Sequence, residues 1–169
     1  HEVQKDNGEP YAVYTPYMKR WKAAYADVSK LKFSSEDLLN NLFKTKPFTF
    51  PHLDELGFTS VDFQFPRKKV AAKILTEYAK SRDYPALDAT SHLGLHLRFG
   101  TVSIRNAAKI AQQKSDIWLN ELIWREFFSM LLDLNPHSEN ETFKENYSKV
   151  PWKKTSPHLK AWCEGQTGY

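Results

Sequence analysis

Residues 118–127 constrain the fold of this chain more than any other segment, because they combine two indoles with three charged groups. They read Trp-Leu-Asn-Glu-Leu-Ile-Trp-Arg-Glu-Phe. At 3.6 residues per turn, a helix here carries two overlapping stripes, one of Trp118, Glu121, Leu122 and Arg125 and one of Glu121, Trp124, Arg125 and Phe128. Charges placed between indoles indicate a surface that stacks flat rings. An amphipathic core helix with an (i, i+4) Glu121–Arg125 pair explains the spacing equally well.

Aromatic residues are abundant in a chain whose length of 169 residues fits one domain. A domain of this size buries roughly 70% of its unfolded surface, so a substantial core is expected. The five Trp, eleven Phe and eight Tyr exceed what a helical core requires. This excess favours flat ligands or large contacts between helices.

Basic side chains are concentrated in residues 67–82, although the net charge of the whole chain is only +4. Six basic residues against the single acid Glu77 give this segment a net charge of +5: Arg67, Lys68, Lys69, Lys73, Lys80 and Arg82. A local patch of this kind suits a polyanion better than a membrane. A solvated helix face is the simpler alternative, because most charge runs are of that kind.

Cysteine and histidine usage argues against a disulfide framework or a metal site. Cys163 is the single cysteine, and the six His residues show no metal-ligand spacing, so we expect no metal. The sequence has no run of about 20 apolar residues, and its first residues are polar. We therefore expect neither a membrane span nor a secretory signal, and a reducing, cytoplasmic location.

Helix caps and apolar periodicity predict an all-α fold without strands. The expected helices run from Thr15-Pro16 to about Val28, from about 68 to 81, from a Thr90-Ser91 cap to Gly100, from a cap at 101–103 to about Lys114, from an Asp116 cap to before Pro136, and from near Ser156-Pro157. Residues 31–65 are interrupted by Pro47, Pro51 and Gly57. They are predicted to be extended, with one short helix near residues 36–42.

Several motifs resemble those of the photolyase and cryptochrome family and occur in the family's order. They are Tyr14-Thr15-Pro16-Tyr17, Thr90-Ser91-His92-Leu93-Gly94, Leu97 to Ser103, Trp118 to Phe127, and Trp162 to Tyr169. The chain looks most like the class I cyclobutane pyrimidine dimer photolyases. The resemblance implies a multihelical FAD-binding domain of photolyase type that is present only in part. Residues 1–13 would be a linker from a missing N-terminal antenna domain, and residues 14–169 the first half of the catalytic domain.

The resemblance also implies a set of cofactor-binding residues. The segment Thr90, Ser91, His92, Leu93 and Gly94 would hold the FAD phosphates, Tyr78 would touch the cofactor, and Trp118 would pack against the flavin. A capped helix start offers unpaired N–H groups to an anion, which fits Thr90-Ser91, although an ordinary helix cap is the alternative. His92 stands where many members have Arg, and Gly94 where many have Ser. The loss of that hydroxyl removes one possible phosphate donor.

A second set of residues is implied for DNA and for electron transfer. Glu121 and Trp124 would meet a pyrimidine dimer flipped out of the helix, and Arg82, together with Arg125, would contact DNA. Stacking on an indole returns about 1–3 kcal/mol per base. Trp152 would be the solvent-side member of an electron-transfer chain. The alternatives are a salt bridge for Glu121, a pair with Asp83 for Arg82 and simple packing for Trp152.

The function implied by the resemblance is blue-light-dependent repair of ultraviolet-damaged DNA that contains pyrimidine dimers, by electron transfer from reduced FAD. The antenna chromophore is not identified by this part of the sequence. We expect the parent protein to be monomeric and the isolated fragment to be inactive. A cryptochrome-type photoreceptor without repair activity, and a cofactor-free helical module that binds nucleic acid, remain as alternatives.

Overall fold

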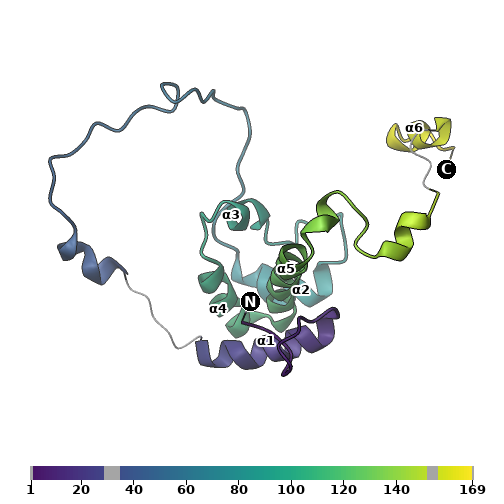
Figure 1. The fold of residues 1–169 in the computed structure, drawn as a ribbon. Helices are drawn as coiled ribbons and strands as arrows, with labels where there is room; N and C mark the ends of the chain where they lie inside the picture. Colours follow the sequence, from purple (N-terminus) through teal and green to yellow (C-terminus); the bar gives the residue numbers. More distant parts are fainter. Residues whose placement is uncertain (1, 29–34, 152–155, 169) are drawn as a thin grey trace. The chain divides into compact units, whose positions relative to one another are not determined.

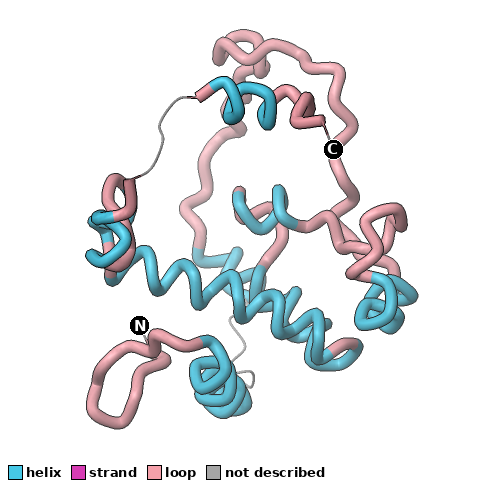
Figure 2. Tube along the Cα trace, turned by 90° about the vertical axis from the view of Figure 1, so that its right-hand side faces the viewer, coloured by secondary structure: helices cyan, strands magenta, loops and turns pink. Residues whose placement is uncertain are grey.

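The computed structural model describes residues 2–28, 35–151 and 156–168, and all regular elements in these ranges are helices (Figures 1 and 2). They are α1 Tyr14–Val28, η1 Ser35–Asn41, α2 Ala72–Ser81, α3 Gly94–Arg98, α4 Ile104–Lys114, α5 Asp116–Leu134, η2 Pro136–Glu139, η3 Glu145–Lys149 and α6 Pro157–Cys163. The predicted all-α fold is therefore confirmed. The chain divides into two compact units, residues 1–127 and 128–169, which are described separately below.

Helix α1 packs on the part of α5 that belongs to the first unit. Tyr17 is 1% exposed, and its ring lies 5.1 Å from that of Phe127. The indole N–H of Trp21 donates to the Glu126 carboxylate at 2.7 Å, and Lys22 pairs with Asp116 at 2.6 Å. Helix α1 begins at Tyr14, two residues before the predicted first helical residue Pro16, so Thr15 is helical and does not cap it. Pro16 still lies in the first turn, which suits proline.

Helices α2 and α4 form the second packed pair of this unit. Leu75 of α2 is buried, and α4 buries three alanines, Ala107, Ala108 and Ala111. Such small side chains let two helix backbones approach closely. The Ser103 side chain accepts a hydrogen bond from the backbone N–H of Asn106 at 3.4 Å, which confirms the predicted cap of α4.

Three other predicted helix starts are also wrong. Helix α2 begins at Ala72 instead of about residue 68, because Ala71 has an extended backbone with ψ 137°. Helix α3 begins at Gly94, and its N-cap, Leu93, makes no side-chain cap bond, so Thr90-Ser91 do not cap it. The cap of α5 is Ser115, whose hydroxyl accepts from the Trp118 N–H at 3.3 Å, and Asp116 is already helical.

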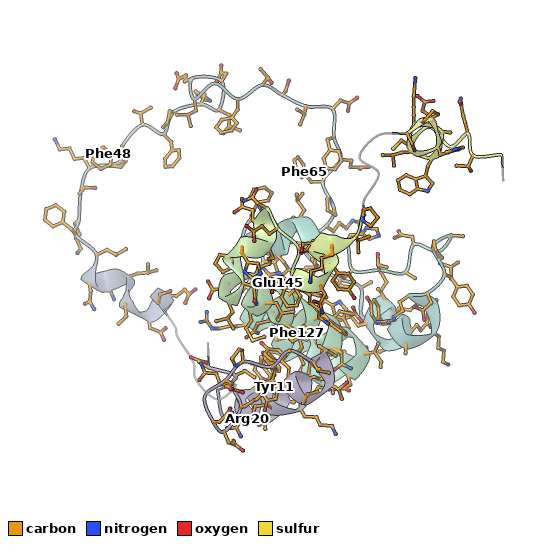
Figure 3. All side chains as sticks on the ribbon, turned by 45° about the vertical axis from the view of Figure 1, so that its right-hand side comes forward. Tyr11, Arg20, Phe48, Phe65, Phe127 and Glu145 are labelled. Carbon is orange, nitrogen blue, oxygen red and sulfur yellow. The ribbon has the colours of Figure 1, made fainter. Side chains whose placement is uncertain are left out.

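Residues 42–65 contain turns but no helix, as predicted, and they expose several large apolar side chains. Phe48 is 82% exposed on this segment, whereas Phe127 is 4% exposed among the helices (Figure 3). The short helix expected near residues 36–42 is confirmed as the 3₁₀ helix η1. The segment therefore contributes little to the core of the first unit.

The second unit consists of the end of α5, the 3₁₀ helices η2 and η3, and α6. The hydroxyl of Ser156 accepts from the Leu159 N–H at 3.1 Å, and Pro157 occupies the first turn, so the predicted start of α6 is confirmed. Trp162 on this helix is 70% exposed. No helix within the described ranges has the length and apolarity needed to cross a membrane.

Candidate cofactor and nucleic-acid site

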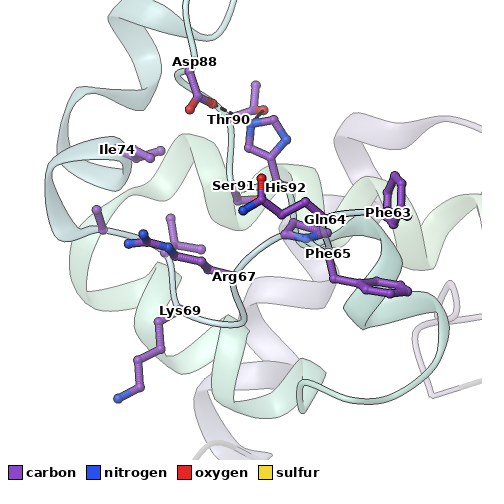
Figure 4. Close-up of a pocket in the computed structure, with 13 residues that line it drawn as sticks. Phe63, Gln64, Phe65, Arg67, Lys69, Ile74, Asp88, Thr90, Ser91 and His92 are labelled. Atoms are coloured by element: carbon purple, nitrogen blue, oxygen red, sulfur yellow. Dashed lines mark hydrogen bonds and ion pairs between the residues drawn. The ribbon is translucent and has the colours of Figure 1, made fainter. Parts of the chain in front are cut away.

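A cavity of about 950 Å³ lies between the loop before α2, helix α2 itself and the loop before α3 (Figure 4). Thr90, Ser91 and His92 line it on the side of the second loop, and Arg67 and Lys69 line it from the first. Its other lining residues are Phe63, Gln64, Phe65, Pro66, Val70, Ala71, Ile74 and Asp88. Three residues predicted to bind a phosphate therefore share one cavity with two cationic side chains.

The loop before α3 is held by an interaction that the sequence analysis did not predict. His92 Nε2 lies 2.6 Å from Asp88 Oδ1, and the backbone of His92 has φ 50°, in the left-handed region. A left-handed residue cannot continue a right-handed helix, which explains why α3 starts only at Gly94. The Ser91 hydroxyl meanwhile accepts from the Leu93 N–H at 3.5 Å. Side chains around the cavity, and not a capped helix start, are thus the donors available to an anion.

A smaller cavity of about 290 Å³ shares Lys69 and Val70 with the larger one. Leu93 and Trp118 line it, and each is 3% exposed. Its other lining residues are Lys68, Leu75, Val102, Asn106, Ala107 and Ile110. Two further predicted cofactor residues therefore meet at a mostly apolar cavity that adjoins the first.

Gly94 and Tyr78 were predicted to bind the cofactor, but they do not line these two cavities. A Cβ atom added at Gly94 would meet no atom within 4 Å, so crowding does not explain the missing serine side chain. Tyr78 is 9% exposed on α2, with the Arg82 guanidinium 5.9 Å from its ring centre. Burial raises the pKa of Tyr78, and the negative charge of Glu121 raises it further.

Arg82 and Glu121, both predicted to contact DNA, form an ion pair between the end of α2 and α5. Arg82 also lies 3.4 Å from Asp83, as the simpler interpretation of this residue expected. The hydrogen bond to Glu121 raises the pKa of the guanidinium. The ion pair thus places a cation and an anion together at an exposed part of the first unit.

The indole of Trp124 is half-buried and stacks on Tyr14, with ring centroids 3.5 Å apart and planes 6° from parallel. Phe127 meets the same indole edge-on at 5.7 Å. Sequence reasoning missed the stack, although Tyr14 belongs to one of the recognised motifs. No local pattern could reveal it, because the two residues lie on different helices.

Two further residues predicted to act in DNA binding or electron transfer are Arg125 and Trp152. Arg125 is exposed, and its Nη2 donates to the Leu97 carbonyl at 3.3 Å. Trp152 lies outside the described residues. Within the described ranges, no group of three or more His, Cys, Asp or Glu side chains is placed to hold a metal ion.

His96 is a second residue that the sequence analysis overlooked. Its buried ring lies 2.8 Å from the Pro66 carbonyl through Nε2 and 2.8 Å from the Thr101 hydroxyl through Nδ1. A carbonyl can only accept, so Nε2 carries the proton in the bond to Pro66. Because Pro66 lines the larger cavity, His96 ties one wall of that cavity to α3.

Alkaline pH is expected to destabilise the fold. Two tyrosines at the α1–α5 contact bind their protons more tightly in the folded chain than in the unfolded chain, so a high pH favours unfolding. Burial and the charges of Glu121 and Asp116 raise the pKa of Tyr14 to about 12, and burial and Glu126 also raise the pKa of Tyr17. A tyrosine in the unfolded chain ionises at about pH 10. The contribution of these phenols is therefore fully present below that pH and is lost as the pH rises through the folded pKa.

The measurement is the free energy of unfolding by urea at increasing alkaline pH, combined with tyrosinate absorption of the folded protein. Tyr14→Phe should show a smaller decline than the parent chain, because it lacks one of the ionising groups. A stability that does not change while the tyrosines ionise would contradict this assignment.

The two adjoining cavities fit a ligand that has both a phosphate and a flat ring. Arg67, Lys69 and the hydroxyls of Thr90 and Ser91 form a donor set for phosphate oxygens. Trp118 and Leu93 present apolar surface, as ring systems require. The first unit is therefore a helical domain with two adjoining cavities, one lined in part by cationic side chains and one mostly apolar, and with a cluster of charged and aromatic groups on α5.

Comparison with known proteins shows which proteins this chain resembles. Residues 118–169 match the family model described as the FAD binding domain of DNA photolyase. Deoxyribodipyrimidine photo-lyases from Halobacterium salinarum and Escherichia coli are each 29% identical over 99% of this chain, and that from Salmonella typhimurium is 30% identical over 99%. The chain covers 40%, 39% and 39% of these relatives, respectively. The chain is thus similar to DNA photolyases over nearly its whole length, and it spans about two fifths of theirs.

Proposed function

We propose that this chain is part of an FAD-dependent photolyase that splits cyclobutane pyrimidine dimers in ultraviolet-damaged DNA under blue light. The observation that carries the proposal is the meeting of five predicted cofactor residues at two adjoining cavities. Thr90, Ser91 and His92 line the larger cavity, and Leu93 and Trp118 line the smaller one. These residues are separated by up to 28 positions in the sequence, so only the tertiary fold brings them together.

The residues of the larger cavity would bind the phosphates of FAD. Arg67 and Lys69 supply positive charge, and the hydroxyls of Thr90 and Ser91 supply hydrogen bonds. His92 is paired with Asp88, so it does not replace the arginine found at this position in many members as a freely available cation. When bound, FAD supplies the electron that light transfers to the dimer.

The residues of the smaller cavity would exclude water and orient the ring system. Trp118 and Leu93 are almost fully buried, and Leu75 lines the cavity beside them. Water exclusion strengthens electrostatic interactions and prevents side reactions of a reactive intermediate. The structure provides this apolar wall on one side, and we propose that the remainder of the parent protein completes it.

The charged and aromatic cluster on α5 would receive the damaged base. Trp124 would stack on the flipped dimer, and Glu121 would accept a hydrogen bond from it, while Arg82 and Arg125 would contact DNA. Extruding a dimer costs less than extruding a normal base, because a damaged base pairs poorly. In this arrangement Arg82 would pair with Glu121 and also donate hydrogen bonds to DNA, since a guanidinium has five N–H donors.

The remaining expectations concern the parent protein. We propose that residues 1–13 link the helical domain to an antenna domain with its own chromophore, and that residues 14–169 form the first half of the FAD-binding domain. Trp152 would pass electrons to the flavin from the solvent side. We also propose that the parent protein is cytoplasmic and monomeric.

The test is the FAD content of the complete parent protein, purified in the dark and read from its visible absorption after desalting. We expect stoichiometric FAD, and Thr90→Val should weaken FAD retention about tenfold because it removes one phosphate donor. Thr76→Val is the matched control, because the Thr76 hydroxyl bonds within α2 and lies outside both cavities. A complete protein without flavin, or equal losses in the two variants, would contradict the proposal.

Illumination separates repair from signalling. The FAD-loaded complete protein should remove dimers from a damaged duplex under blue light and leave them in the dark. Photoreduction of the flavin without loss of dimers would instead identify a cryptochrome-type photoreceptor. The isolated 169-residue chain is expected to be inactive in the same assay, because it spans about two fifths of its relatives' length.

A further inference from the structure

The geometry points to Tyr14 as a positioning residue that holds the indole of Trp124 in the orientation a flipped pyrimidine needs. This inference rests on the proposed function, in which Trp124 stacks on the damaged base. Nothing in the resemblance gives Tyr14 a role. A ring stack, a hydrogen bond and the backbone that carries Tyr14 support this role.

The ring stack limits the motion of the indole. The Tyr14 ring lies 3.5 Å from the Trp124 ring, with only 6° between their planes, so one face of the indole rests against the phenol. Phe127 contacts both rings nearly perpendicularly, at 5.8 Å from Tyr14 and 5.7 Å from Trp124. Rotation of the indole about its side-chain bonds would break the stack with Tyr14.

A hydrogen bond fixes the position of Tyr14 in turn. Its hydroxyl donates to the Asn120 carbonyl at 2.9 Å, one helical turn before Trp124 on α5. A phenol keeps its proton at neutral pH, so this hydroxyl is a donor there. The phenol is therefore held at both its ring and its oxygen by the same helix that carries the indole.

The backbone of Tyr14 adds a third constraint. Tyr14 is the first residue of α1, and Pro16 two positions later restricts the first turn. Further along, Trp21 and Lys22 fasten α1 to α5 through Glu126 and Asp116. The stack is thus set by the packing of two helices instead of by a flexible side chain alone.

Positioning matters because binding must otherwise order the indole. Immobilising a side chain on binding weakens association by about three- to tenfold. A base that meets an indole already held in place avoids this loss, whereas undamaged DNA, whose bases stay stacked, gains nothing from it. Tyr14 should therefore act on the preference for damaged DNA and leave general DNA affinity unchanged.

The experiment measures this preference in the complete, FAD-loaded protein, in the dark. The probe is a DNA duplex with one thymine dimer, and the preference is the ratio of its affinity to that of the same duplex without damage. Tyr14→Leu should lower the ratio about three- to tenfold. Tyr14→Phe should retain most of the ratio, because it keeps the flat ring.

Tyr25→Leu is the matched control. Tyr25 also lies on α1 and also stacks on an indole, that of Trp21, at 4.7 Å and 17°. Removing this stack should leave the ratio unchanged, and flavin content should stay normal in every variant. If Tyr14→Leu lowers the folded fraction, Tyr14→Met replaces it, because the unbranched methionine side chain adapts to an irregular space without being a flat ring.

The outcomes separate this inference from the proposed function. An unchanged ratio in the non-aromatic Tyr14 variant, while Trp124→Ala lowers it, would overturn the positioning role and leave the proposed function intact. Equal losses in the Tyr14 and Tyr25 variants would also overturn it, because they would reflect general loosening of α1. An unchanged ratio in Trp124→Ala would instead refute the proposed role of the indole itself.

Discussion

Ile123→Ala is expected to lower the free energy of unfolding by about 2–5 kcal/mol. Ile123 is 0% exposed, so the lost methyl groups leave a cavity that surrounding side chains fill only in part. Denaturation by urea, monitored by circular dichroism, measures the change. The transition midpoint should shift without a large change in slope.

The control for this variant is Ile117→Ala in the same helix. Ile117 is 38% exposed near the start of α5, so the same truncation removes less buried surface. We expect a loss below about 1 kcal/mol there. Equal losses of unfolding free energy at the two positions would mean that Ile123 is not more buried than Ile117, contrary to the structure.

Trp124→Ala in the complete protein is expected to lower the preference for dimer-containing DNA by about 5- to 150-fold. This range corresponds to the loss of about 1–3 kcal/mol for one stacked base. The affinity for undamaged DNA should change little, because that affinity comes mainly from phosphate contacts. Competition binding of damaged and undamaged duplexes in the dark gives the ratio directly.

Trp162→Ala provides the comparison. Trp162 on α6 is also an indole, is 70% exposed, and has no proposed DNA contact. Its removal should leave both the ratio and the flavin content unchanged. If Trp124→Ala removed flavin as well as damage preference, the indole would belong to the cofactor site instead of the DNA site.

Helix α5 combines a buried side with a neighbouring side that carries charged and aromatic groups. It buries Trp118, Leu119, Leu122, Ile123 and Phe127, as a core helix does. Glu121 and Trp124 are only half-buried, and Arg125 is exposed. The ion pair of Glu121 runs to Arg82 on another segment, so the carboxylate is not explained by its own helix alone. One side of the helix supports the fold, and the neighbouring side carries the proposed chemistry.

Local signals in the sequence identified two helix caps correctly. The caps at Ser103 and Ser156 depend on residues within one turn, so the sequence identifies them directly. The start of α3 could not be predicted in this way. It follows a left-handed backbone at His92, whose side chain contacts Asp88, and neither feature changes apolar periodicity.

The sequence by itself determined the helical class, the family motifs and the candidate residues, because side-chain type and spacing along a helix are local properties. Only the tertiary structure decided which candidates meet. It placed Thr90 to His92 with Arg67 and Lys69, paired Arg82 with Glu121, and stacked Tyr14 on Trp124 across 110 positions. These contacts join residues far apart in the chain, and their geometry follows from helix packing, which no single segment of the sequence encodes.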